Sequence, residues 1–378
     1  MKRLIVLIIL ISATLSVWGQ PPSVEIITPV SGYYVAPVGI GNGTPLTELL
    51  IVDTYSVMAQ LHSFDSQSID YAVISNVETS VAMYSFQIDA NDNIDVIDLN
   101  TGEITSRITM NGLAYPMSWF PNDQAILFHL FDFGLNSIIS IEVGSENENP
   151  LIEFVDNNQY EFPLNYIDPT ITTAQVRQIN FVDMNPRYPN WLVGQMQVVY
   201  PSPDGNEQFV SLFTFLFDSD TDTYVPLNSY FESPPFTIKA EWSPDGTHLY
   251  FHLQDSERKI VLIEFDPITS SITVSESASS KLEGDKLVVV LDWLDVADLL
   301  LLSEGDQMYI GQILDGELHI VEFFSIDRDI LGFDRIGRGD WRFEGDESEA
   351  AQISCIFDET LPTRLEIGAQ AQVAFTDG

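Results

Sequence analysis

The stretch Ala240-Glu241-Trp242-Ser243-Pro244-Asp245-Gly246-Thr247-His248-Leu249-Tyr250-Phe251 contains two short segments rich in apolar residues, joined by a polar turn. Pro244 presets φ for the second position of a β-turn, and Gly246 accepts a left-handed backbone, so the chain reverses there at little cost. Aromatic and apolar residues on both sides of the turn are typical of half-buried strands. The stretch therefore predicts a strand, a tight turn and a second strand.

Related units recur along the chain. Incomplete copies of the same stretch are Trp119-Phe120-Pro121-Asn122-Asp123, Ser202-Pro203-Asp204-Gly205 and Trp293-Leu294-Asp295. A second unit, a strand that ends in an acidic residue before a turn, occurs at Asp53, Asp98, Glu142, Asp218, Asp266 and Asp315. These residues are 44 to 49 positions apart, except for one interval of 76 positions between Glu142 and Asp218. Units of about 45 residues match one four-stranded blade of a β-propeller.

The repeat predicts an all-β chain that forms a β-propeller of about six, between five and seven, four-stranded blades. The unit near Asp53 is expected to be the outer hairpin of a blade that C-terminal strands within 329–337 and 339–343 complete. Joining the two ends in this way removes exposed sheet edges. The long interval before Asp218 leaves room for one more blade.

The segment Trp242-Ser243-Pro244-Asp245-Gly246 resembles the blade motif of TolB-like, WD-repeat-related β-propellers. The same motif occurs in the propeller domains of prolyl-oligopeptidase-type peptidases. One blade matches well and three match in part, while the rest of residues 51–342 matches by spacing only. The resemblance implies the fold and leaves the function open, because such propellers have many roles.

The composition excludes several classes of partner. The 378 residues include 15 Lys+Arg and 56 Asp+Glu, which give a formal net charge of −41. A hydrophobic content of 45% is too high for an acidic disordered protein, and a chain of this length can bury a large core. Like-charge repulsion argues against nucleic acid and anionic membrane surfaces as partners.

The N-terminus has the pattern of a signal peptide over residues 1–19. Met1-Lys2-Arg3 is basic, an apolar run begins at Leu4, and cleavage is expected after Gly19. The apolar run is too short to span a bilayer comfortably, although an uncleaved anchor stays an alternative. The prediction is an extracellular or periplasmic protein with no membrane span after cleavage.

The remaining boundaries follow from composition. Residues 20–45 are rich in Pro and Gly and predict an irregular strap, and residues 46–343 form the propeller. Residues 344–378 begin with an acidic linker and end in a tail that resembles the start of a bacterial Src-homology-type barrel, either truncated or only strand-like. Cys355 is the single cysteine, so no intrachain disulfide is expected.

Calcium is the one metal retained as a candidate cofactor. Two turn segments place oxygen ligands at alternate positions, as the start of a calcium loop does. The predicted ligands are Asp218, Asp220, Asp222, Asp89, Asn91 and Asn93. Both segments depart from the EF-hand pattern, so ordinary hairpin turns stay the alternative. The five histidines form no zinc motif, and no nucleophile elbow is present.

The densest basic cluster lies near the end of the propeller. Arg and Trp are enriched in binding hot spots, so the cluster predicts a contact with a partner. Its members are Arg335, Arg338, Trp341 and Arg342. The alternative is local charge pairing with Asp334 and Asp340.

The function predicted from the sequence is an exported, non-enzymatic module that binds a protein, a peptide or a glycan. The alternative is a propeller hydrolase, or the propeller part of a larger peptidase, that uses acidic residues and calcium. No catalytic residue is singled out among the many carboxylates. Two carboxyls that face each other at the centre, with raised pKa values, would favour the enzyme.

Overall fold

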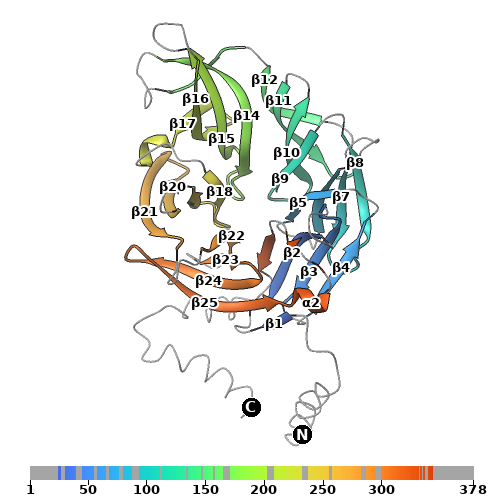
Figure 1. Ribbon diagram of the computed structural model, residues 1–378. Coiled ribbons are helices and arrows are strands. Elements are labelled where there is room, and N and C mark those ends of the chain that lie inside the picture. The colour runs from blue at the N-terminus through green and yellow to red at the C-terminus, as the bar shows by residue number, and fades with distance from the viewer. Residues whose placement is uncertain are drawn as a thin grey trace, which may run out of the picture.

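The computed structural model confirms the all-β prediction and shows six antiparallel sheets arranged around a centre (Figure 1). It describes residues 24–26 and 30–343, apart from 40–44, 55–57, 65–67, 76–79, 87–92, 111–112, 133–134, 146–147, 156–157, 165–170, 202–207, 232–236, 255–257, 282–286, 295–298, 332, 334 and 337–338. The predicted signal peptide and the C-terminal tail with Cys355 lie outside the described residues.

The six sheets are the blades, numbered here along the chain. Blade 1 contains β2 (Gly32–Gly39), β3 (Glu48–Asp53), β4 (Met58–Ser63), β26 (Arg335–Ile336) and β27 (Asp340–Phe343). Blade 2 contains β5 (Ser68–Ile74), β6 (Ser80–Phe86), β7 (Asn93–Asp98) and β8 (Ile104–Thr109). Blade 3 contains β9 (Leu113–Trp119), β10 (Ala125–Asp132), β11 (Leu135–Glu142) and β12 (Glu148–Val155).

The second half of the chain forms the other three blades. Blade 4 contains β13 (Tyr160–Glu161), β14 (Thr173–Met184), β15 (Trp191–Pro201), β16 (Gln208–Asp218) and β17 (Thr223–Pro226). Blade 5 contains β18 (Thr237–Trp242), β19 (His248–Leu253), β20 (Lys259–Asp266) and β21 (Ser271–Ser279). Blade 6 contains β22 (Val289–Trp293), β23 (Leu300–Glu304), β24 (Gln307–Leu314), β25 (Glu317–Ile326) and β1 (Val24–Ile26).

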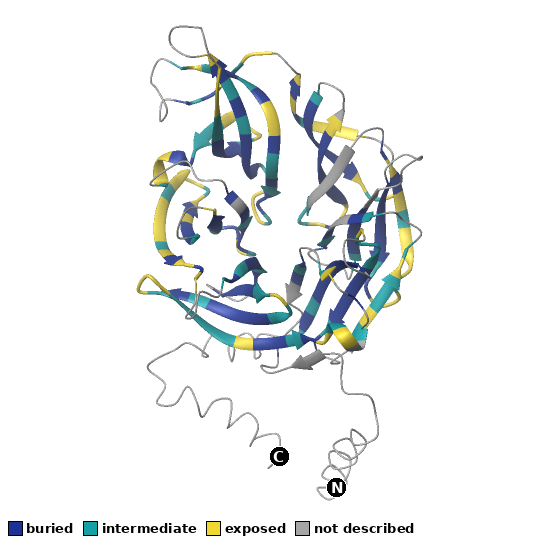
Figure 2. Ribbon diagram, viewed as in Figure 1, coloured by how far each residue is buried: buried dark blue, intermediate teal, exposed yellow. Residues whose placement is uncertain are grey.

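The innermost strands form a closed ring. In order around the centre they are β27, β5, β9, β14, β18 and β22, and each contacts the next, with β22 returning to β27. Outer strands such as β8, β12 and β21 expose many of their residues, whereas the middle strands are largely buried (Figure 2). The ring thus contains one inner strand from every blade.

The two ends of the chain close the propeller, as the sequence predicted. β27 pairs with β2 from Gly32 to Val35, and β26 pairs with Val38 and Gly39. β1, from the N-terminal part of the chain, joins blade 6, where it pairs with β25. Residues 32–39 were expected to be part of an irregular strap, and this expectation is wrong, because the segment is a buried strand whose partners, β3 and β27, lie on both sides.

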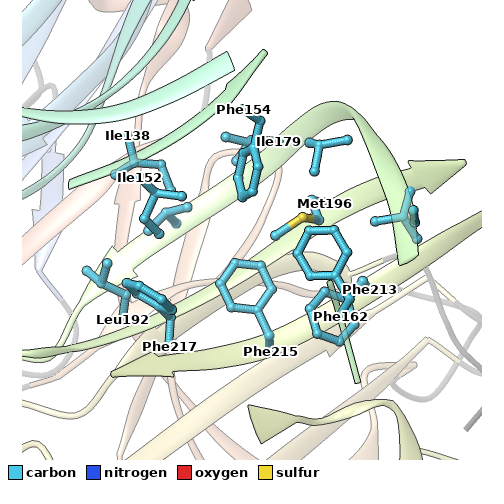
Figure 3. Close-up of a cluster of buried hydrophobic side chains, with 14 of the residues drawn as sticks. Ile138, Ile152, Phe154, Phe162, Ile179, Leu192, Met196, Phe213, Phe215 and Phe217 are labelled. Carbon is cyan, nitrogen blue, oxygen red and sulfur yellow. The ribbon is translucent and has the colours of Figure 1, made fainter. Parts of the chain in front are cut away.

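The interval of 76 residues contains no extra blade among the residues described. Apart from β12 of blade 3, its strands belong to blade 4, whose β14, β15 and β16 have 12, 11 and 11 residues. This long blade packs against blade 3 through an aromatic-rich core that includes Phe154, Phe162, Phe213 and Phe215 (Figure 3). Longer strands, rather than an additional sheet, therefore account for the missing repeat.

The turn between β18 and β19, which contains Pro244 and Gly246, connects blade 5 with blade 4. Trp242 is buried and its ring meets that of Phe265 at 5.2 Å in an edge-on arrangement, so it is a packing residue. Gly246 adopts φ +71°, and its carbonyl accepts a hydrogen bond of 2.8 Å from Asn185 Nδ2 of blade 4. A Cβ at position 246 would overlap Asn185 Oδ1.

Helical structure among the described residues is limited to η1 (Asn228–Tyr230) and α2 (Arg328–Leu331). No helix in that part of the chain combines the length and the apolar character that a membrane crossing requires.

Candidate functional site

The inner strands of five blades carry a polar side chain at one equivalent position, directly before a large apolar residue. The pairs are Ser118-Trp119 on β9, Asp183-Met184 on β14, Glu241-Trp242 on β18, Asp292-Trp293 on β22 and Asp340-Trp341 on β27. Side chains alternate along a strand, so the two members of each pair point to opposite faces. The apolar members are buried and the polar members are half-buried. Four successive blades thus bring one carboxylate each to the inner ring.

These polar side chains connect neighbouring blades. In four cases the side chain accepts a hydrogen bond from the backbone N–H of the residue that follows the equivalent position in the next blade. The bonds run from Met184 N to Ser118 Oγ (3.3 Å), from Trp242 N to Asp183 Oδ2 (3.1 Å), from Trp341 N to Asp292 Oδ2 (3.3 Å) and from Ile74 N to Asp340 Oδ2 (2.7 Å). The inner ring is therefore held by side chains where no sheet ladder crosses between blades.

Glu241 has different partners. Its carboxylate forms an ion pair with Lys239 and accepts a hydrogen bond of 2.7 Å from Tyr250 Oη. The ammonium of Lys239, which is only 7% exposed, also donates to the carbonyl of Leu291. The indole N–H of Trp293 donates to the backbone carbonyl of Glu241 at 3.2 Å. One cation is thus enclosed at the junction of blades 5 and 6.

The local electrostatics favour neutral carboxyls. Burial raises the pKa of Asp183 to about 7, and the negative charge of Glu241 adds to this shift. Burial also raises the pKa of Asp292 well above its usual range, with further contributions from Glu241 and Asp340, against the opposing charge of Lys239. Like charges at short distance disfavour ionisation of both partners. Asp292 therefore binds a proton more readily than an isolated carboxyl does.

A metal ion needs several oxygens within one small volume. In the part of the chain that the structure describes, only Glu241, Asp292 and Asp340 meet that condition, with one oxygen from each within 4.8 Å of the others. Lys239 already supplies a positive charge to Glu241, and backbone N–H groups already bind Asp292 and Asp340. These contacts account for the cluster without a metal ion.

The arrangement can do two things chemically. It presents an excess of carboxylate over ammonium, which favours a cationic group brought by a partner. It also places Asp292, whose pKa is raised, next to a second carboxyl, that of Asp340, and general acid and base chemistry needs two such groups.

The predicted partner-binding residues are not one exposed patch in the described structure. Trp341 is 4% exposed and packs edge-on against Phe323 at 5.2 Å, so it belongs to the core. Arg335 is exposed on the short strand β26. Arg338 and the side chain of Arg342 lie outside the described residues. A partner site at this cluster stays a prediction for the arginines, while burial removes Trp341 from it.

The predicted calcium residues of blade 4 form a hairpin turn. Asp218 Oδ1 accepts hydrogen bonds from Asn190 Nδ2 (3.0 Å) and the backbone N–H of Asp220 (3.1 Å), and Oδ2 accepts one from Thr221 Oγ1 (2.8 Å). Asp220 and Asp222 are exposed. Asp266 binds its turn in the same way, through Ile268 N (2.8 Å) and Thr269 Oγ1 (2.7 Å). The recurrent acidic residue thus has a structural reason that involves no metal.

The second calcium candidate is only partly described. Asn93 is buried and its Oδ1 accepts a hydrogen bond of 3.2 Å from Thr109 Oγ1, whereas Asp89 and Asn91 lie outside the described residues. Calcium binding at either segment stays a prediction.

The inner carboxylates were not recognised from the sequence, although a signal was present. An acidic residue directly before a tryptophan occurs three times in the second half of the chain, as Glu241-Trp242, Asp292-Trp293 and Asp340-Trp341. This dipeptide repeats at the same place in three blades, which is the signal that marks the inner carboxylates. Asp183 could not be found in this way because Met184 follows it.

We compared the chain with known proteins. No protein-family model matches this chain, and neither does any curated protein. Solved structures that resemble it include TolB from Acinetobacter baumannii, with a TM-score of 0.49 and 15% identity over 84% of this chain and 68% of that chain. A putative 6-phosphogluconolactonase from Bacteroides fragilis has a TM-score of 0.44 and 10% identity over 85% of this chain and 100% of that chain.

A third similar structure comes from a study of two prolyl endopeptidases, with a TM-score of 0.44 and 12% identity over 80% of this chain and 50% of that chain. With every one of these three TM-scores below 0.5, the similarities say nothing about what this chain binds.

Proposed function

We propose that this chain is a binding module for a positively charged segment of a protein or peptide. The observation that carries the proposal is the charge balance of the inner ring. Asp183, Glu241, Asp292 and Asp340 come from four successive blades, and the one ammonium in contact with them in the described structure is that of Lys239. All four residues are half-buried rather than fully enclosed.

The contacts of Lys239 show how the inner ring can bind an ammonium group. Its charge is held by a carboxylate and a backbone carbonyl in a largely buried environment. Charge interactions in such an environment are stronger than in bulk water. The net charge of −41 would in addition attract a basic partner over distance and accelerate its association at low salt. A basic partner also meets none of the like-charge repulsion that disfavours nucleic acid.

The test is a titration of the chain with a labelled oligolysine peptide and with an oligoglutamate peptide of equal length, at low and at moderate salt. Binding of the basic peptide is expected, weakening as salt rises. The double variant Asp183→Asn and Asp340→Asn keeps the hydrogen-bond acceptors and should weaken binding by about ten-fold or more. The matched control is Asp220→Asn with Asp222→Asn, which removes the same charge at an exposed turn.

Equal affinity of both double variants would reject the inner ring as the site. No binding of oligolysine at low salt would reject the proposal as a whole.

A second candidate is a hydrolase that uses Asp292 and Asp340. Its supporting observation is the raised pKa of Asp292 beside a second carboxyl, which gives one group able to donate a proton and one able to accept it. Asp340→Asn should then reduce turnover of nitrophenyl glycosides or esters by about a hundred-fold or more. No turnover above the uncatalysed rate across such a panel would reject this candidate.

The compartment belongs to the same proposal. The basic and apolar N-terminal segment supports export, and the partner would then be met outside the cytoplasm. Comparing the molecular mass of the mature chain with cleavage after Gly19 tests this directly.

A further inference from the structure

The junction between blades 6 and 1 depends on a very short segment. Residues 339–341 contact three different blades, and they come from the far end of the chain. Gly39 and Ile336 are the last residues of β2 and β26 at this junction, and β27 follows after a break of three residues. The inner strand of blade 1 is thus made of two short pieces, and the rest of the ring closes through them.

Each residue of the segment has its own contact. Gly339 is buried against the ring of Tyr34 on β2, where a Cβ would overlap the ring. Asp340 accepts the N–H of Ile74 on β5 of blade 2 at 2.7 Å. The backbone N–H of Trp341 donates to Asp292 Oδ2 on β22 of blade 6 at 3.3 Å. Blades 1, 2 and 6 are therefore joined at one point.

The charges around this point come from several strands. Asp292 on β22 interacts with Asp340 on β27 and with Glu241 and Lys239, both on β18. On β2, Tyr34 interacts with Asp340 and, from the side of blade 6, with Asp306 and Arg328. Among these groups only Lys239 and Arg328 are positive, and each is already paired, with Glu241 and Asp306 respectively. Among the side chains that the structure describes at this point, a second negative charge on Asp292 and Asp340 would therefore find no cation that is not already paired.

We propose that residues 339–341 are a proton-operated latch, closed when Asp292 carries a proton beside Asp340 and loosened when Asp292 releases that proton to solvent. Release leaves two carboxylates facing each other, one on the closing strand and one on blade 6. Repulsion between them pushes β27 away from β22 and weakens the contact of Asp340 with Ile74. The latch involves two carboxyls of the inner ring but does not require that a ligand bind there, so the hydrogen-exchange test below is made without any ligand.

The direction of the pH effect follows from the shift of Asp292. Its pKa in the folded chain is raised, so its contribution to closure is complete at acidic pH and is lost as pH rises through the folded value. Acid therefore tightens the junction and base loosens it. The same titration leaves the contacts within blade 4 untouched.

The test is amide hydrogen exchange from pH 5 to pH 8, with rates corrected for the chemical pH dependence of exchange. Protection of the Ile74 and Trp341 amides should fall by about ten-fold or more as pH rises. Protection of the Phe215 and Phe217 amides, within blade 4, should change much less. Parallel loss at all four amides would mean general destabilisation and would overturn the latch.

Variants complete the test. Asp340→Asn keeps an acceptor for Ile74 N–H but cannot carry the second charge, so protection at Ile74 and Trp341 should stay high across the pH range. Asp292→Asn removes the charge of the other carboxyl and should also keep protection at Ile74 and Trp341 high. It replaces the first variant if Asp340→Asn does not fold. Asp329→Asn, an exposed acid on α2, is the matched control and should respond to pH as the unmodified chain does. A pH response of Asp340→Asn or Asp292→Asn equal to that of this control would also overturn the proposal.

Discussion

Asp183 illustrates how a single residue can stabilise a junction and destabilise the fold at once. Its two oxygens accept the N–H groups of Met184 (2.9 Å) and Trp242 (3.1 Å), which links blades 4 and 5. The same position is removed from water and lies near Glu241, so the ionised form is disfavoured. The hydrogen bonds need an acceptor oxygen and do not need a charge.

The pH dependence of stability follows from this. The pKa of Asp183 is about 7 in the folded chain against 3.8 for an unperturbed carboxyl, so stability is complete below about pH 3.8 and is lost as pH rises through 7. Asp183→Asn should remove about 2–3 kcal/mol of the loss in unfolding free energy between pH 5 and pH 8. Urea unfolding at several pH values measures this.

The control is Asp220→Asn at an exposed turn, which should leave the pH dependence unchanged. An unchanged slope for Asp183→Asn would mean that Asp183 is ionised in the folded chain throughout this range.

At the scale of elements, the turns connect blades as well as strands. The turn after β18 reaches blade 4 through Gly246 and Asn185, and Asn185 in turn accepts hydrogen bonds from the N–H groups of Arg187 and Tyr188, both at 2.9 Å. A glycine is required there for two separate reasons, the left-handed φ of +71° and the close approach of Asn185. A residue of blade 4, Asn185, therefore contacts the turn of the blade motif in blade 5 directly.

Replacing two glycines separates these reasons. Gly144 has φ +81° with no other atom near enough to meet a Cβ, so Gly144→Ala should cost only the backbone strain, about 1–2 kcal/mol. Gly246→Ala should cost roughly 1–3 kcal/mol more, because Asn185 must move. Thermal or urea unfolding of the two variants gives the difference. Equal costs would show that the contact between the turns contributes nothing.

A turn carboxylate gives a prediction that also bears on calcium. Hydrogen bonds from Asn190 and Thr221 lower the pKa of Asp218 despite partial burial, so its contribution is present above pH 3.8 and lost in acid, opposite to Asp183. Asp218→Ala should lower stability by about 1 kcal/mol through the lost turn bonds. Melting curves with chelator and with millimolar calcium decide between the two roles: a turn role predicts equal loss in both, and a calcium site predicts a larger loss with calcium.

At the scale of the whole molecule, closure depends on contacts between residues about 300 positions apart. Trp341 and Trp293 are both 4% exposed, but only Trp341 lies on a strand that closes the ring. Each tryptophan packs against another aromatic ring, Phe323 at 5.2 Å and Tyr250 at 5.7 Å respectively. The two tryptophans are therefore equally buried, but only one of them lies on the strand that pairs with β2.

Trp341→Ala and Trp293→Ala should each lower the free energy of unfolding by about 3–5 kcal/mol. Only Trp341→Ala should also reduce amide protection along β2, because it weakens the packing that holds β27 against β2. Hydrogen exchange at Tyr34 and Val35 measures this. Equal protection of these two amides in both variants would show that the ring stays closed without Trp341.

The sequence by itself determined the all-β class, the blade length and the joining of the two ends. These follow from local signals, since alternation, turn residues such as Pro244 and Gly246, and acidic residues such as Asp218 act within a few positions. The inner ring was decided only by tertiary structure. Asp183, Glu241, Asp292 and Asp340 lie about 50 or more positions apart, and each was one acid among 56 until the blades placed them side by side. Burial and neighbouring charges then raise the pKa of Asp183 and of Asp292, which no local pattern predicts, because the shift arises from what surrounds a carboxyl in space and not from its neighbours in sequence.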